Sequence, residues 1–122
     1  MKGDVIVTKI ICIDFDNTIC EWDYPDAGPP KEGVKEALQE LKSSGYEIHI
    51  LSCRTNPELK KHVIDRREQV RFMEEYLSKH EIPFDVVLNE FKPLALYYVD
   101  DRALEFKDNW ADIVKRIKEQ DE

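Results

Sequence analysis

The run IICIDFDNT, residues 10–18, constrains the fold of this chain more than any other stretch. It opens with consecutive apolar residues, which is typical of a parallel strand covered on both faces. Asp14 and Asp16 then interrupt the apolar residues, although burying an ionised carboxylate without a partner is costly. The pattern predicts a strand over about residues 9–14 that carries two acids to its carboxyl end.

Strand-like and helix-like segments alternate along the rest of the chain. Apolar residues at helical spacing predict helices over about residues 31–44, 59–80 and 109–119. Short apolar runs predict further strands over about residues 46–51, 85–88 and 95–99. Strands separated by helices indicate an α/β fold with a three-layer, Rossmann-like parallel sheet. We expect about four core strands, with the first strand central and helices on both faces of the sheet.

Length and charge limit what the chain can be. Its 122 residues suit one domain with one core, so we expect residues 1–122 to form a single domain. No apolar stretch approaches the roughly 20 residues of a membrane span, and the N-terminal residues do not read as a signal peptide. No membrane partner is therefore expected, and a cytoplasmic location is the default. The net charge of −8 disfavours broad nucleic-acid binding.

Polar residues gather where the predicted strands end. Ser52 and Arg54 follow the second strand, and Lys92 precedes the expected fourth strand. Asp100 and Asp101 follow that fourth strand. If the first strand lies between the second and the fourth, all these side chains converge on one edge of the sheet together with the two acids of the first strand.

Such a cluster of carboxylates favours a metal ion. Like charges held close together raise one another's pKa values unless a cation enters. Oxygen ligands without organised His or Cys select Mg²⁺, with Mn²⁺ possible. An acidic metal site beside Lys92 and Ser52 suits phosphoryl transfer, in which catalysis is mostly positioning and charge neutralisation. Asp14 or Asp16 would then be available as a carboxylate nucleophile.

These residues resemble the four motifs of the haloacid dehalogenase superfamily of phosphatases. The family's motifs stand in this chain, in the family's order, as D-x-D-x-T over residues 14–18, Ser52, Lys92, and the pair Asp100-Asp101. D-x-D-x-T alone recurs by chance, whereas four motifs in order at expected strand ends are typical of the family. The resemblance covers most of the chain.

The resemblance implies a role for each acid. Asp14 corresponds to the nucleophile that attacks phosphorus, and Asp16 to the general acid/base, whose backbone carbonyl also binds Mg²⁺. Asp100 corresponds to a direct metal ligand and Asp101 to a ligand through water. The metal set expected on this basis is Asp14, Asp16, Asp100 and Asp101.

The phosphate-binding set implied by the resemblance is Ser52, Lys92, Thr18 and Asn17. Lys92 would also offset the charge of the nucleophile, and Thr18 would tie down the turn through its hydroxyl. Many family members have Gly where Asn17 stands. Asn tolerates left-handed backbone geometry, so the turn is expected to survive.

The chain is short for this family, whose members usually carry a cap domain. The stretches between motifs leave no room for a folded cap, so we expect a capless member with residues 19–30 as a flap. An open site suits a large substrate, or a lid lent by a neighbouring subunit of a homo-oligomer. Trp22 either stacks on the substrate or packs the flap onto the body. Arg54 either grips a second anionic group of the substrate or pairs with the surrounding carboxylates.

The expected activity is Mg²⁺-dependent hydrolysis of a phosphomonoester, of unknown substrate class, through an aspartyl-phosphate. One alternative is a phosphatase acting on a macromolecular phosphate such as a nucleic-acid end. Another is a non-catalytic phospho-binding module that resembles a receiver domain. In receiver domains the acidic pair follows the first strand, whereas here it comes last, and this order argues against them.

Overall fold

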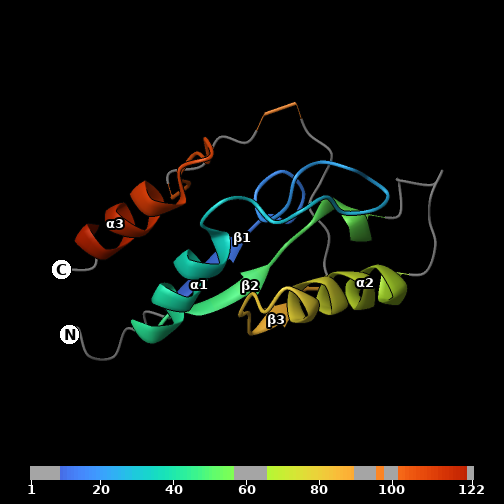
Figure 1. Ribbon diagram of the computed structural model, residues 1–122, viewed down its shortest axis with the longest axis horizontal. Coiled ribbons are helices and arrows are strands. Elements are labelled where there is room, and N and C mark those ends of the chain that lie inside the picture. Colours follow the sequence, from blue (N-terminus) through green and yellow to red (C-terminus); the bar gives the residue numbers. More distant parts are fainter. Residues whose placement is uncertain (1–8, 57–65, 90–95, 98–101, 121–122) are drawn as a thin grey trace.

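The computed structural model describes residues 9–56, 66–89, 96–97 and 102–120. These residues form an α/β fold with a small parallel sheet and helices (Figure 1). The strands are β1 (Ile10–Ile13), β2 (Glu47–Ile50) and β3 (Val86–Val87). The helices are α1 (Val34–Ser43), α2 (Arg66–Lys79) and α3 (Trp110–Gln120), with a short 3₁₀ helix, η1 (Cys53–Thr55), after β2.

The three strands run parallel in the order β1-β2-β3. Ile10 to Ile13 pair with Glu47 to Ile50, and His49 and Ile50 pair with Val86 and Val87. Parallel neighbours need a crossover connection, and α1 and α2 supply the two crossovers. The sheet therefore has the parallel order that the alternation of strands and helices predicted.

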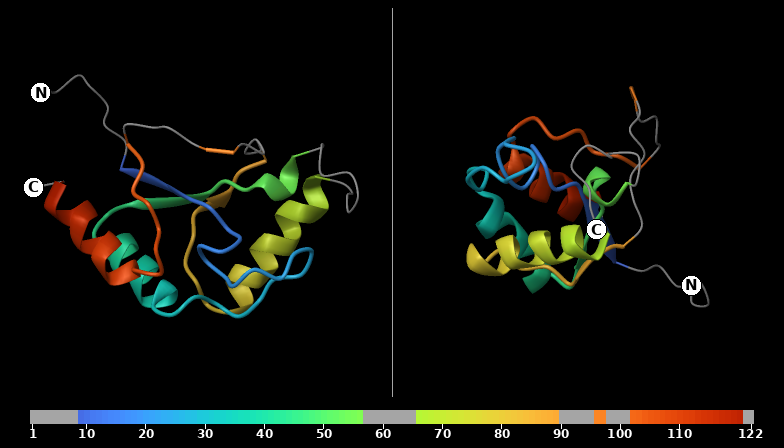
Figure 2. Two further views of the ribbon diagram at one scale, coloured as in Figure 1. Left: turned by 90° about the horizontal axis from the view of Figure 1, so that it is seen from above. Right: turned by 90° about the vertical axis from the view of Figure 1, so that its right-hand side faces the viewer.

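The described helices cover one face of this sheet. Ile13, Ile48, Ile50 and Val87 on the covered face are at most 5% exposed, whereas Ile10 on the other face is 37% exposed. Successive strand–helix–strand units that advance in one direction place their helices on the same face. Figure 2 (left) accordingly shows α1 and α2 on the same side of the strands. Helices on both faces are therefore not confirmed among the described residues.

The expected fourth strand falls largely outside the described residues. Of residues 95–99 the structure describes only Leu96 and Tyr97, which belong to no strand and are 89% and 79% exposed. Their apolar character favoured a strand, but neither side chain is buried here. Beside β1 the described residues supply only β2 as a hydrogen-bonded neighbour. The central place of the first strand stays a prediction.

Each helix buries one apolar stripe. The buried residues of α1 are Val34, Ala37, Leu38 and Leu41. Gly45 follows α1 with a φ of 96°, which glycine adopts without strain and which is common just after the end of a helix. None of the helices in the described ranges is both long and apolar enough to pass through a bilayer.

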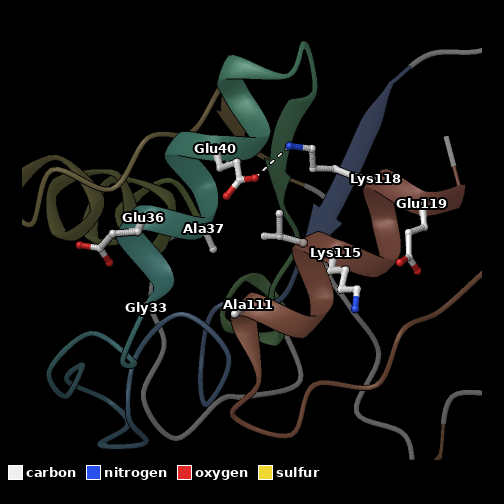
Figure 3. Close-up of a pocket in the computed structure, with 9 residues that line it drawn as sticks. Gly33, Glu36, Ala37, Glu40, Ala111, Lys115, Lys118 and Glu119 are labelled. Atoms are coloured by element: carbon white, nitrogen blue, oxygen red, sulfur yellow. Dashed lines mark hydrogen bonds and ion pairs between the residues drawn. The ribbon is translucent and has the colours of Figure 1, made fainter. Parts of the chain in front are cut away.

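Helix α3 packs on α1 and leaves a groove of about 510 Å³ between them. Across this groove Lys118 Nζ of α3 lies 2.9 Å from Glu40 Oε2 of α1 (Figure 3). The residues that line the groove are Gly33, Glu36, Ala37, Glu40, Ala111, Val114, Lys115, Lys118 and Glu119. None of them belongs to the predicted site, whose residues lie near the strand ends.

Candidate functional site

Two of the predicted site residues follow neighbouring strands at the same edge of the sheet. Asp14 comes directly after β1, and Ser52 comes two residues after the end of β2. The strands are still joined at this point, because the amide of Leu51 donates to the carbonyl of Ile13 over 3.1 Å. The convergence predicted for Asp14 and Ser52 is therefore present in the structure.

The chain turns sharply after Asp14. The carbonyl of Phe15 accepts from the amides of Thr18, Ile19 and Cys20 at 3.4, 2.9 and 3.4 Å. Asn17 has a φ of 59°, in the left-handed region that Asn tolerates, as the sequence predicted. The Asp14 carboxylate Oδ1 accepts from the amide of Phe15 over 2.9 Å, which orients this side chain at the mouth of the turn.

The backbone of Thr18 ties the turn to α3. Its carbonyl accepts a 3.0 Å hydrogen bond from Nε1 of Trp110, which begins α3. The expectation that the Thr18 hydroxyl fixes the turn stays a prediction. The observed anchor acts on the Thr18 carbonyl and comes from a helix 92 residues away in sequence.

The Ser52 hydroxyl is held by the helix it caps. Its Oγ accepts from the amide of Arg54 over 3.0 Å, and Ser52 is 2% exposed. Thr55 Oγ1 donates to the Ser52 carbonyl over 3.3 Å, which closes the same turn. An N-cap side chain fixed in this way keeps its hydroxyl at the strand end.

Asp16 pairs with Arg54 through two parallel hydrogen bonds. Arg54 Nε donates to Asp16 Oδ2 over 2.8 Å, and Nη2 donates to Asp16 Oδ1 over 2.7 Å. Only 1% of the Arg54 side chain and 13% of the Asp16 side chain are exposed. A bidentate pair of this kind has well-defined geometry as well as strong attraction. Of the two readings of Arg54, the ion pair with a site carboxylate is the one present.

The guanidinium of Arg54 also lies among aromatic rings. Its Cζ is 4.8 to 5.3 Å from the ring centroids of Tyr24, Phe72 and Phe15. A cation over an aromatic face is attracted by the ring quadrupole, more strongly where water is excluded. The rings therefore hold the guanidinium and compensate part of its burial.

The flap, residues 19–30, is a closed loop with its own hydrogen bonds. The Glu21 amide donates to the Pro29 carbonyl over 2.9 Å, and the Gly28 amide donates to the Glu21 carbonyl over 3.1 Å. Tyr76 of α2 donates its hydroxyl to the Gly28 carbonyl over 2.7 Å. These bonds attach the flap to the body of the domain.

Trp22 lies on the exposed side of the flap. It is 65% exposed and stacks on Tyr24, with ring centroids 5.9 Å apart and an angle of 29° between the planes. Trp22 therefore contacts a neighbour within the flap and does not pack the flap onto the body. Its exposed face is open to a binding partner.

Two groups near the turn have raised pKa values. Burial, aided by the negative charge of Asp16, raises the pKa of the Cys20 thiol to about 11. A thiol with such a pKa is neutral at physiological pH and is a poor nucleophile. Burial also raises the pKa of the Tyr76 hydroxyl, so this group stays a hydrogen-bond donor.

Three predicted site residues, Lys92, Asp100 and Asp101, lie outside the described residues. Within the described ranges no group of three or more His, Cys, Asp or Glu side chains is arranged to hold a metal ion. Asp14 and Asp16 are thus the part of the expected metal set that the structure places.

Sequence reasoning missed three contacts that shape the site. The hydrogen bonds from Arg54 to the flap carbonyls, from Tyr76 to Gly28 and from Trp110 to Thr18 join segments far apart in the chain. The sequence does carry a signal for the contacts of Tyr76 and Trp110. Each is an aromatic residue with a polar atom on an apolar helix stripe, and a buried Tyr or Trp usually finds a hydrogen-bond partner.

Comparison with known proteins supports the fold over nearly the whole chain. No family model matches the chain, and no curated protein matches it. A conserved protein from Bacteroides thetaiotaomicron is 23% identical in sequence, with 93% of each chain covered and a TM-score of 0.61. A protein of known crystal structure from Vibrio cholerae is 26% identical, with 94% of this chain and 100% of that chain covered and a TM-score of 0.66.

Proposed function

We propose that the protein is a Mg²⁺-dependent phosphomonoester hydrolase of the haloacid dehalogenase type, without a cap domain. The observation that carries this proposal is that Asp14 and Ser52 follow the paired carboxyl ends of β1 and β2, and that Asp16 pairs with Arg54, two residues after Ser52. Ligand sites of parallel α/β sheets lie at this edge. Two carboxylates and a fixed hydroxyl there suit the handling of a phosphoryl group.

In the proposed reaction Asp14 attacks phosphorus with a carboxylate oxygen. The bond between phosphorus and the alcohol oxygen breaks, and Asp16, which takes up a proton from solvent as the substrate binds, gives that proton to the leaving alkoxide. A water molecule then attacks the phosphorus of the aspartyl-phosphate while Asp16 takes a proton from it. Inorganic phosphate leaves, and the Asp14 carboxylate is regenerated. Ser52 and Lys92 bind the phosphoryl oxygens.

The oxygen donors of the site fit a hard cation. Asp14 offers its carboxylate and Asp16 its backbone carbonyl, and these are ligand types that Mg²⁺ takes together with water and phosphate oxygens, with Mn²⁺ as a possible substitute. Asp100 and Asp101 would complete the set. A bound Mg²⁺ would neutralise charge on the transferring phosphoryl group. Asp14 and Asp16 would then have distinct tasks beside the same ion.

We also propose a fourth strand and a cover over the site. A fourth strand over about residues 95–99 would lie beside β1, make it central and bring Asp100 and Asp101 to the shared edge. The flap over residues 19–30 would then be the chain's own cover over the site.

A nucleic-acid end is a second candidate substrate. The paired rings of Trp22 and Tyr24, with Trp22 65% exposed, offer a platform on which a base can stack. A terminal phosphate needs contact with few nucleotides, so the net charge of −8 does not oppose it strongly.

The test is hydrolysis of a panel of phosphate esters with Mg²⁺, comprising nucleotides, sugar phosphates, phosphopeptides and oligonucleotides with terminal phosphates. Asp14→Asn should lower turnover by about 10⁴-fold or more because it removes the nucleophile. Asp112→Asn, a change of the same kind on the exposed face of α3, should leave turnover unchanged. Excess EDTA should stop the wild-type reaction.

Full activity of Asp14→Asn would refute the nucleophile, and full activity in EDTA would remove the metal from the proposal. A wild-type protein that hydrolyses no ester of the panel but accumulates a stable aspartyl-phosphate would support the receiver-like alternative.

A further inference from the structure

We infer that Arg54 is a positioning residue that sets the orientation of Asp16 and the closure of the flap together. The inference rests on the proposed function, because it assigns Arg54 to the proposed acid/base of the reaction. The juxtaposition that carries it is a single guanidinium, buried at the strand end, that bonds a site carboxylate and two flap carbonyls at once.

Arg54 fixes the carboxylate of Asp16. Both oxygens of Asp16 accept from Arg54, at 2.7 and 2.8 Å. A planar guanidinium bound to both oxygens fixes the plane of the carboxylate as well as its position, which an ammonium group does not do. General acid/base catalysis depends on this orientation, because the group has to be within hydrogen-bond reach of the proton it moves.

Arg54 also bonds the flap. Arg54 Nη1 donates to the Pro25 carbonyl over 2.7 Å, and Nη2 donates to the Asp26 carbonyl. These carbonyls lie in the middle of the flap, between the hydrogen-bonded residues Glu21 and Gly28. Moving the flap away would therefore leave a charged, buried donor without two of its acceptors, which is costly.

Arg54 has at most one N–H group left to bind a substrate. A guanidinium has five N–H groups, and four of them are directed at Asp16 and the flap. The aromatic rings of Phe15, Tyr24 and Phe72 lie around the same guanidinium, and Arg54 is 2% exposed. Arg54 therefore acts on the reaction through Asp16 and the flap.

The experiment combines amide hydrogen exchange with steady-state kinetics on the wild type, Arg54→Lys, Arg54→Ala and Asp16→Asn. Arg116→Ala, on the exposed face of α3, is the matched control. The amides of Glu21 and Gly28 report on the flap, and the amides of α1 report on the body. Kinetics use the best ester of the panel with Mg²⁺.

In Arg54→Ala the two flap amides should exchange about tenfold faster or more, since one bond from a charged donor carries about that factor. The α1 amides should keep their wild-type rates. Asp16→Asn should also speed exchange of the flap amides, because Arg54 loses its ion partner. Arg54→Lys should lie between Arg54→Ala and the wild type, because it keeps the charge and loses the fork.

Arg54→Ala should lower kcat by about tenfold or more and should change KM by less. Guanidinium added well below denaturing concentration should restore part of the kcat of Arg54→Ala, whereas methylammonium should not. Arg116→Ala should match the wild type in both measurements.

Wild-type flap exchange in both Arg54 variants would overturn the flap connection, whatever the activity. A loss confined to KM would overturn positioning and indicate a substrate contact. If the wild type hydrolyses no ester, the proposed function fails, while the exchange rates of Arg54→Lys and Asp16→Asn still decide whether Arg54 links Asp16 to the flap.

Discussion

The anchoring of the Asp14–Asp16 turn by α3 can be tested with Trp110→Phe. Trp110 is 5% exposed, donates Nε1 to the Thr18 carbonyl over 3.0 Å, and packs against Phe106 with ring centroids 5.1 Å apart. Phe keeps an aromatic ring at this position but removes the donor and part of the indole. The change therefore removes the hydrogen bond to Thr18 and leaves only a small space beside the remaining ring.

The expected cost has two parts. Loss of the hydrogen bond costs about 1 kcal/mol, and more if the Thr18 carbonyl is left without a partner. The space left by the smaller ring costs about 1 kcal/mol more, well below the full deletion of a Trp side chain. We expect Trp110→Phe to lower the free energy of unfolding by about 2 to 3 kcal/mol.

Trp22→Phe supplies the matched control, because the same substitution is made at a side chain that is 65% exposed. It should change the free energy of unfolding by less than about 0.5 kcal/mol. Urea unfolding followed by circular dichroism measures both variants without relying on the fluorescence of the residues that are changed. Equal midpoints for the two variants, at equal slope, would refute the anchoring role of Trp110.

Two further predictions concern the flap and the sheet. Gly28→Ala should lower the free energy of unfolding by about 1 to 3 kcal/mol in urea, because the added Cβ would meet Glu21 O at 2.8 Å and Glu21 Cβ at 2.9 Å; unchanged stability would contradict the close approach. Asp85 has a lowered pKa, chiefly through its hydrogen bond from Lys42 and then through the amide of Ile48. The stability that this carboxylate contributes is present above its ordinary pKa and is lost as the pH falls through the lowered value. The wild type should therefore exceed Asp85→Asn in stability at neutral pH, and the difference should shrink below about pH 4; a difference that grows on acidification would contradict the ion pair.

The elements of the fold were predictable because their signals are local. The periodicity of apolar residues placed β1, β2, α1 and α3 within a few residues of their observed bounds, since burying one face requires that spacing. Asp14 and Ser52 were also predictable as a pair, because parallel strands bring their carboxyl ends to one edge. Local chemistry likewise predicted the left-handed Asn17.

The sequence did not predict the hydrogen-bond partners of the site side chains, because these partners are not set by local signals. Whether Arg54 binds a substrate or Asp16 depends on where the flap lies, and the flap is placed by contacts with residues such as Tyr76, 48 positions from Gly28 in the chain. The anchor of Thr18 likewise comes from Trp110, 92 positions away.

The sequence by itself determined which residues stand at the strand ends, because a strand ends where its apolar run ends and the side-chain period is short. Only the tertiary structure decided which groups those residues form hydrogen bonds with. A guanidinium or an indole N–H bonds whichever acceptor the packed chain brings within about 3 Å, and that choice is made by distant segments. Asp16 therefore acquired Arg54 and the flap as neighbours only when the chain was folded.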